Sequence, residues 1–203
     1  MTQGDRIMEN ISYTNISGLF TRTRCVPVVV LKTIEDTLPT LKALCEYGIP
    51  TAEITFRTAC AADAIRLGRE QLPDMLIGAG TIINAEQARA AIAAGAQFIV
   101  SPGIGADIAE VCREADIPYI PGCVTPAEIM QALSLGITTV KFFPANVYGG
   151  MEAIKALSAP FPQVKFVPTG GVDSNNLDEF LACDKIAAVG GSFFVKLAMQ
   201  GGK

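Results

Sequence analysis

The chain has 203 residues, of which 50% are hydrophobic, and its formal net charge is −4 at pH 7. This length can bury roughly 70% of the unfolded surface around one core, so we expect a single domain over residues 1–203. The apolar runs stay shorter than the roughly 18 residues of a membrane span, which excludes a membrane-spanning protein. No basic patch occurs, which excludes a nucleic-acid-binding protein. The first residues lack the order of a secretion signal, and we expect a cytoplasmic protein.

Short apolar runs alternate with longer amphipathic stretches from one end of the chain to the other. The expected strands, rich in β-branched and aromatic residues, are 26–31, 51–55, 75–79, 97–100, 118–120, 138–142, 165–168 and 187–190. The expected helices between them include 34–47, 59–71, 85–94, 106–115, 127–135 and 175–181. Successive strands are roughly 20–26 residues apart, which is the length of one βα unit.

Capping residues stand at the expected ends of these helices. Gly48, Gly95 and Gly136 each lie between a helix and the following strand, where glycine suits a helix C-cap. Asn84 and Thr125, the latter followed by proline, suit helix starts. The local signals therefore agree with the hydrophobic pattern.

Eight βα-like units without a linker predict a (β/α)₈ barrel of the TIM type. A doubly wound sheet is the alternative, but it usually has fewer strands and a GxGxxG turn after the first one, and this pattern does not occur here. Residues 1–24 are expected to form an N-terminal helical cap at the bottom of the barrel. Only residues 193–203 follow the eighth strand, and they include Gly201-Gly202, so the final helix is expected to be short or missing.

One lysine stands inside an expected strand. Lys141 lies in the run TTVKFFP, residues 138–144. Burial disfavours the charged form of an ammonium, and a neutral amine is a nucleophile able to form a Schiff base with a ketone. The alternative is a lysine at a strand end whose head group reaches water.

The second expected strand carries the other candidate catalytic group. Because side chains alternate along a strand, Glu53, Thr55 and Arg57 share one face. If that face points into the barrel, a carboxylate and a guanidinium lie at its mouth, and Arg57 has the fork geometry that holds a carboxylate. The alternative is an internal ion pair that only stabilises the fold, although burial of such a pair is a weak source of stability.

Glycine turns follow three of the expected strands. The third strand ends in GAGT (78–81), the seventh in PTGGV (168–172) and the eighth in GGS (190–192). Each turn by itself is consistent with a simple βα connection. Phosphate-binding barrels use the loops after strands seven and eight, where glycine lets the backbone approach an anion, so the last two turns together predict a phosphate site.

Histidine is absent from the sequence. This excludes Ser-His-Asp and Cys-His mechanisms and the common zinc sites, while a carboxylate-only magnesium site stays open. Acid–base chemistry then falls on Asp, Glu, Lys, Tyr, Cys or water. The six cysteines have irregular spacing, which predicts reduced, mostly buried thiols, and nothing near Cys123, on an expected loop, indicates a lowered pKa.

Together these residues resemble the family of 2-keto-3-deoxy-6-phosphogluconate (KDPG) and 4-hydroxy-2-oxoglutarate (KHG) aldolases. The matching segments are VPV (26–28), EITFRT (53–58), GAGT (78–81), SPG (101–103), PG (121–122), KFFPA (141–145), PTGG (168–171) and GGS (190–192). The resemblance covers the chain from about residue 10. It implies a class I aldolase on a (β/α)₈ barrel, a homotrimer that uses no metal or cofactor.

The resemblance also implies roles for particular residues. Lys141 would be the Schiff-base lysine and Glu53 the general acid and base, while Arg57 and Thr81 would bind the pyruvate carboxylate. The distal and phosphate region would be lined by Thr169, Gly170, Gly171, Gly191 and Ser192. The sequence departs from the family pattern at 123–124, in the loop 146–148 and at the short C-terminal segment.

The implied reaction is reversible cleavage of KDPG to pyruvate and glyceraldehyde 3-phosphate, with cleavage of KHG to pyruvate and glyoxylate as a second activity. The glycine turns favour a phosphorylated substrate, but the sequence leaves the choice among KDPG, its galactonate epimer and KHG open. Two alternatives differ in class. One is another phosphate-handling barrel enzyme, such as an isomerase or epimerase, and the other is a non-catalytic sugar-phosphate-binding barrel.

Overall fold

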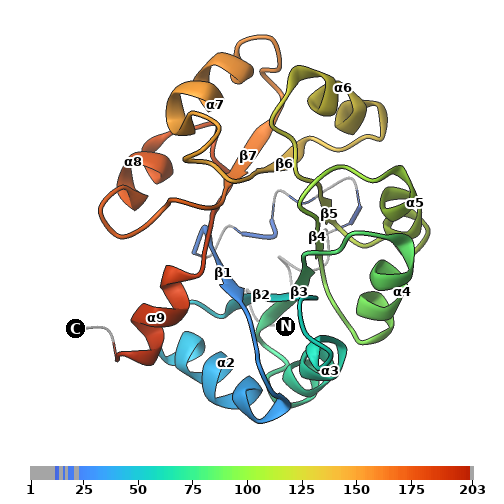
Figure 1. Cartoon of the computed structure of the whole chain (residues 1–203), viewed down its shortest axis with the longest axis vertical. Helices are drawn as coiled ribbons and strands as arrows, with labels where there is room; N and C mark the ends of the chain where they lie inside the picture. Colours follow the sequence, from blue (N-terminus) through green and yellow to red (C-terminus); the bar gives the residue numbers. More distant parts are fainter. Residues whose placement is uncertain (1–11, 14–15, 17, 21–22, 202–203) are drawn as a thin grey trace.

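The computed structural model describes residues 12–13, 16, 18–20 and 23–201. In this part of the chain, parallel strands alternate with helices, and Figure 1 shows the helices arranged around the strands. The strands are β1 (Cys25–Val29), β2 (Thr51–Thr55), β3 (Leu76–Gly80), β4 (Ile99–Val100), β5 (Tyr119–Ile120), β6 (Thr139–Phe142), β7 (Lys165–Pro168) and β8 (Val189–Gly191). The helical elements are η1 (Ile34–Asp36), α2 (Thr37–Glu46), α3 (Ala61–Gln71), α4 (Ala85–Ala93), α5 (Ala106–Glu114), α6 (Pro126–Ser134), α7 (Gly150–Ser158), α8 (Leu177–Ala182) and α9 (Phe193–Met199).

The strands close into a barrel in which two neighbouring pairs, β5–β6 and β7–β8, are joined by isolated bridges instead of continuous ladders; we call these two junctions seams. Continuous ladders join six strands in the order β5-β4-β3-β2-β1-β8, and a separate ladder joins β6 to β7. Isolated parallel bridges connect the two groups: Gly122↔Lys141 between β5 and β6, and Phe166↔Ile186 and Thr169↔Gly190 between β7 and β8. The predicted (β/α)₈ barrel is confirmed, and the doubly wound alternative is wrong because β8 pairs with β1.

Each expected strand has a counterpart, and the predicted bounds of β2 and β7 agree with the structure. Helix α7 was not among the expected helices. It begins at Gly150 with Gly149 as its N-cap, and the φ angles of these two residues, 56° and 93°, are left-handed, so the helix lacks a Ser, Thr, Asp or Asn start signal. Glycine at a helix start is a weak signal, so this helix is not marked in the sequence.

The predicted caps are present. The Asn84 side chain accepts a hydrogen bond from the Gln87 N–H at 2.8 Å, and Thr125 accepts one from Glu128 at 3.3 Å. Gly48, Gly95 and Gly136 have φ angles of 88°, 95° and 79°, the left-handed conformation of a C-cap. These residues end and begin helices as the sequence indicates.

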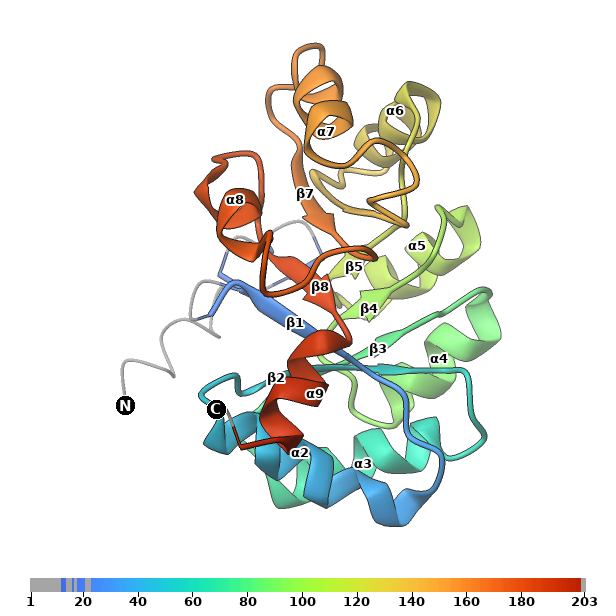
Figure 2. The ribbon, with the colours of Figure 1, turned by 60° about the vertical axis from the view of Figure 1, so that its left-hand side comes forward.

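The final helix α9 is present and has 7 residues, so the expectation of a short helix is confirmed and that of a missing one is wrong. Figure 2 shows α9 lying beside α2, and the two helices pack against each other. Buried Phe194 and Ala198 lie on α9. None of the helices in the described ranges is both long and apolar enough to cross a bilayer.

The expected N-terminal helical cap, residues 1–24, falls largely outside the described residues. Within the described part, residues 18–20 form a turn rather than a helix. Leu19 and Phe20 on this turn are buried in one apolar cluster with Phe98, at the amino end of β4, and with Val167 on β7, and Phe20 is edge-to-face on Phe98 at 5.6 Å between ring centroids. Apolar side chains thus fill this end of the barrel and leave the carboxyl ends of the strands as the open face.

Strand alternation separates the outer core from the interior. On β2, Ile54 packs with Ile77, Leu41 and other residues in the layer between strands and helices. Its neighbours Glu53 and Thr55 therefore point to the other side of the strand, into the barrel. This alternation brings a carboxylate into the interior.

Candidate active site

Lys141 and Glu53 meet inside the barrel. Lys141 Nζ lies 3.3 Å from Glu53 Oε1, and the two side chains are only 8% and 2% exposed. The lysine is carried by β6 and the glutamate by β2, on opposite sides of the ring. Lys141 therefore does not reach out to bulk water, and the interpretation of a lysine head group in solvent is wrong.

The space for the Glu53 carboxylate comes from a glycine on the neighbouring strand. A Cβ placed on Gly80 would lie 2.0 Å from Glu53 Oε1, a distance that no side chain can occupy. Strand β2 is fixed by pairing with β3 along its full length, from Thr51↔Leu76 to Thr55↔Gly80. The paired strand β2 thus holds the Glu53 carboxylate, and Gly80, which has no side chain, leaves room for it.

Residues next to Lys141 complete its surroundings. The Phe143 ring centroid lies 5.3 Å from Nζ, within the range of a cation–π contact. The buried Thr55 hydroxyl donates to the Val29 carbonyl at 3.1 Å, so it is used within the barrel wall. The amine thus lies beside a carboxylate and an aromatic ring.

Arg57 lies at the rim of the barrel rather than in its interior. Its side chain is exposed, and its Nε donates a hydrogen bond to Thr81 Oγ1 at 3.1 Å. Glu53 forms its ion pair with Lys141, so the alternative of an internal Glu53–Arg57 pair is wrong. Thr81 has a φ of 58°, which is strained for a β-branched residue and is typical of functional sites. The structure thus brings the two predicted carboxylate-binding residues together.

The glycine turns after β7 and β8 lie side by side. Thr169 pairs with Gly190 across the seam, and a Cβ on Gly190 would lie 2.2 Å from the buried Thr169 Oγ1. Gly170 and Gly171 have left-handed φ angles of 88° and 78°. Gly191 is buried at the end of β8, and Ser192, which follows it, is exposed. The five residues predicted for the distal region therefore form one contiguous part of the rim.

Two residues in this region were missed by the sequence analysis. The Asn146 side chain lies against Gly171, where a Cβ would come within 2.3 Å of it. Asn176 Nδ2 donates to the Gly171 carbonyl at 3.0 Å. Asn146 was noted only as part of a departure from the family pattern, and no local signal indicates that either residue folds back onto the turn.

Cysteines do not supply a reactive thiolate beside the lysine. Cys123 is fully buried, and burial, together with the nearby Glu128 charge, raises the pKa of its thiol to about 12. Burial also raises the pKa of the Cys112 thiol to about 12. In the described ranges, no three His, Cys, Asp or Glu side chains gather as a metal-binding cluster.

A (β/α)₈ barrel with a buried amine beside a carboxylate at its open face is typical of aldolases that work through a Schiff base. Residues 16–202 match the family described as KDPG and KHG aldolase. The chain is 47% identical to 2-dehydro-3-deoxy-phosphogluconate aldolase of Treponema pallidum, over 86% of this chain and 83% of that protein. It is 40% identical to the KHG/KDPG aldolase of Escherichia coli (strain K12), over 90% of this chain and 85% of that protein.

A solved structure agrees with these relatives. The KDPG aldolase from Legionella pneumophila, with pyruvate captured as a covalent carbinolamine intermediate, superposes with a TM-score of 0.85 and 39% identity, covering 92% of this chain and 98% of that chain. This chain belongs to the KDPG and KHG aldolase family, so it is a lyase of the aldolase class, as the sequence motifs indicate.

Proposed function

We propose that this protein cleaves 2-keto-3-deoxy-6-phosphogluconate to pyruvate and glyceraldehyde 3-phosphate through a Schiff base on Lys141. The observation that carries the proposal is the buried pair itself, with 3.3 Å between Lys141 Nζ and Glu53 Oε1. A lysine used only for stability would gain little from this position, because burying an ion pair costs about as much as the pair returns.

The first chemical steps use both residues. Glu53 accepts a proton from the Lys141 ammonium, and the neutral amine attacks the C2 ketone of the substrate to give a carbinolamine. Loss of the C2 oxygen as water leaves a protonated imine. Glu53 lies near enough to return and remove the protons of these steps, directly or through one water.

Carbon–carbon cleavage follows from the imine. The protonated imine withdraws the electrons of the C3–C4 bond while Glu53 accepts the proton of the C4 hydroxyl, which releases the aldehyde. The remaining enamine is protonated at C3, and water hydrolyses the imine to pyruvate and free Lys141. Each proton taken by the carboxylate is returned in a later step.

The two ends of the substrate are assigned to the two parts of the rim. The Arg57 guanidinium, oriented by Thr81, would hold the carboxylate next to the C2 ketone, since guanidinium binds carboxylate through two parallel hydrogen bonds. The turns at 169–171 and 191–192 would hold the phosphate, where glycine allows close approach of backbone N–H groups. Local donors of this kind are needed because the chain carries a net charge of −4.

Borohydride reduction in the presence of pyruvate tests the proposal. A reduced adduct should form on Lys141 and be located there by peptide mass spectrometry, and Lys141→Ala should abolish both the adduct and pyruvate release. The matched control is Lys165→Ala. Lys165 lies on the adjacent strand β7, but it is the first residue of that strand and its Nζ donates to the Asp184 carbonyl at the exposed surface, so this variant should retain the adduct. An adduct on another lysine, or none on an active protein, would reject the mechanism.

A second activity, cleavage of 4-hydroxy-2-oxoglutarate to pyruvate and glyoxylate, is supported by the double name of the Escherichia coli relative. Pyruvate release from KDPG, its galactonate epimer and 4-hydroxy-2-oxoglutarate should be compared. We expect a higher kcat/KM for the two phosphorylated substrates than for 4-hydroxy-2-oxoglutarate, because the rim offers their phosphate two adjoining glycine turns. Saturable binding without pyruvate release would instead indicate a non-catalytic sugar-phosphate binder.

We also propose a homotrimer located in the cytoplasm. The family resemblance supports the trimer, and mass photometry should give about 64 kDa, three times the chain mass of 21.4 kDa. Free thiols at Cys25, Cys60, Cys112, Cys123 and Cys183 support a reducing compartment.

A further inference from the structure

The backbone of Lys141 forms the seam between two parts of the barrel. No continuous ladder joins β5 to β6 in the part of the chain that the structure describes, where the two are connected through the isolated bridge Gly122↔Lys141. The Lys141 N–H donates to the Pro121 carbonyl at 2.8 Å, and the Cys123 N–H donates to the Lys141 carbonyl at 2.9 Å. The position of the lysine along this side of the barrel therefore depends on the short segment 121–123.

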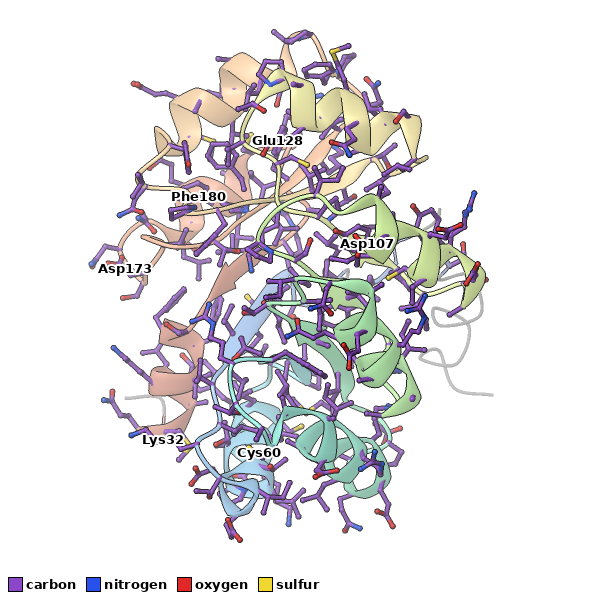
Figure 3. All side chains as sticks on the ribbon, turned by 45° about the vertical axis from the view of Figure 1, so that its right-hand side comes forward. Lys32, Cys60, Asp107, Glu128, Asp173 and Phe180 are labelled. Atoms are coloured by element: carbon purple, nitrogen blue, oxygen red, sulfur yellow. The ribbon has the colours of Figure 1, made fainter. Side chains whose placement is uncertain are left out.

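The residues directly after this segment are held by Glu128, which lies in the first turn of α6 and is labelled in Figure 3. Glu128 Oε2 accepts hydrogen bonds from the N–H groups of Val124 and Thr125, both at 2.9 Å, and from Thr125 Oγ1 at 2.7 Å. The Cys123 thiol donates to the Glu128 backbone carbonyl at 3.6 Å. One glutamate thus binds three consecutive residues, directly after the bridge to Lys141.

The other side of this segment is fixed by close packing. A Cβ on Gly122 would lie 2.0 Å from the Pro102 carbonyl oxygen, so the β4–α5 loop lies directly against the glycine. The segment is therefore confined by Pro102 at Gly122 and by Glu128 at the residues that follow. If the Glu128 contacts were lost, the chain at 123–125 would be free to shift away from Lys141.

We propose that Glu128 is a positioning residue for the Schiff-base lysine: its carboxylate holds the turn after β5, and that turn holds the Lys141 backbone in register. The inference rests on the function proposed above for Lys141. It differs from ordinary helix capping because the capped residues, Val124 and Thr125, directly follow Cys123, whose N–H donates to the Lys141 carbonyl at the seam. Burial alone would raise the pKa of the Glu128 carboxyl, but the hydrogen bonds from Val124 and Thr125 lower it, so the group is charged at neutral pH.

The test is the rate at which borohydride traps pyruvate on the enzyme, measured per folded molecule at saturating pyruvate. A misplaced reacting group slows chemistry more than it weakens binding, so Glu128→Ala should lower the trapping rate and kcat about tenfold with KM changed less than about threefold. Glu128→Gln keeps an acceptor for the same N–H groups and should retain at least about a third of the wild-type rate.

Asp36→Ala is the matched control. Asp36 is the equivalent acid of the capping box on η1, where it accepts from the Thr33 N–H at 3.1 Å. It follows β1, and this strand is paired with β2 on one side and with β8 on the other. Loss of this carboxylate should leave the trapping rate within about twofold, since helix capping by itself contributes only stability.

An unchanged trapping rate in folded Glu128→Ala would overturn the inference. If that variant does not fold, Thr125→Val removes the shared hydroxyl but keeps both backbone N–H bonds to Glu128, and its rate should fall about threefold; no change there would overturn the inference equally. Failure of the wild-type enzyme to trap pyruvate on Lys141 would instead reject the proposed function, so the two failures are distinguished.

Discussion

Gly80 lies directly against the Glu53 carboxylate, on the strand next to it. In the β2–β3 ladder Glu53 pairs with Gly78 and Thr55 pairs with Gly80, so the Glu53 side chain reaches along the ladder to Gly80, where a Cβ would lie 2.0 Å from Oε1. Gly80 of the GAGT run is therefore required by the Glu53 carboxylate rather than by a turn. This contact gives the site its most direct test.

Gly80→Ala should displace the Glu53 carboxylate from Lys141 and lower kcat at least about tenfold, because small misplacements of reacting groups cost large factors in rate. Steady-state pyruvate release measures the effect. Gly103→Ala is the control, since a Cβ there meets nothing within 4 Å, and its activity should stay within about twofold of wild type. Full activity in Gly80→Ala would show that the position of Glu53 does not limit the reaction.

Glu53→Gln removes the proton acceptor while keeping the side-chain volume. Because general acid–base catalysis contributes factors of about 10²–10⁴, kcat should fall by about that range. The same change leaves the Lys141 ammonium buried without its ion-pair partner, so the free energy of unfolding should fall by about 3 kcal/mol.

The double variant Glu53→Gln/Lys141→Met separates these two effects. It removes both charges, so urea unfolding should show stability recovered toward that of wild type while activity remains absent. If the double variant is less stable than Glu53→Gln alone, the buried pair contributes net stability. The argument that Lys141 and Glu53 are buried together for function rather than for stability would then fail.

Arg57→Lys tests the carboxylate end of the site. Lysine keeps the charge but loses the planar fork and the Nε donor to Thr81, so KM for KDPG should rise about tenfold while kcat changes less than about threefold. Arg66→Lys, an exposed arginine paired with Asp63 on α3, should leave both constants unchanged. Equal losses in kcat and kcat/KM would place Arg57 in the chemical step instead of in binding.

The buried thiols make stability dependent on alkaline pH. The pKa of Cys123 is raised from 9.0 to about 12 in the folded chain, so its contribution is fully present below pH 9 and is lost as pH rises from 9 toward 12, where only the unfolded thiol ionises. Urea unfolding at pH 8 and pH 10 should show a loss for the wild type that is about 1 kcal/mol smaller in Cys123→Ala. An identical loss in the two proteins would indicate that this thiol ionises equally in both states.

The same burial makes Cys123 chemically inert in the folded state. A thiol reagent at pH 8 should modify the partly exposed Cys60 before Cys123, and Cys123 should react only at the rate of unfolding. Peptide mapping after timed labelling measures the order. Rapid modification of Cys123 in the folded protein would contradict its burial.

Much of this fold could be predicted because its signals are local. The alternation on β2 placed Glu53 on the face opposite Ile54, and the Thr125-Pro126 start of α6 was recognised from neighbouring residues alone. Helix α7 was missed because two glycines occupy its start, where a capping side chain would normally mark it. Signals that depend on a few adjacent residues are present in the sequence whatever the rest of the chain does.

The sequence by itself determined the order of strands and helices and the presence of a lysine inside a strand, since periodicity and capping are properties of neighbours. Only the tertiary structure decided that Lys141 meets Glu53, 88 residues away, that Arg57 stays at the rim with Thr81, and that the β5–β6 seam runs through the lysine itself. Those relationships arise when the ring of strands closes, because closure fixes the stagger and facing of distant strands, which no local pattern contains.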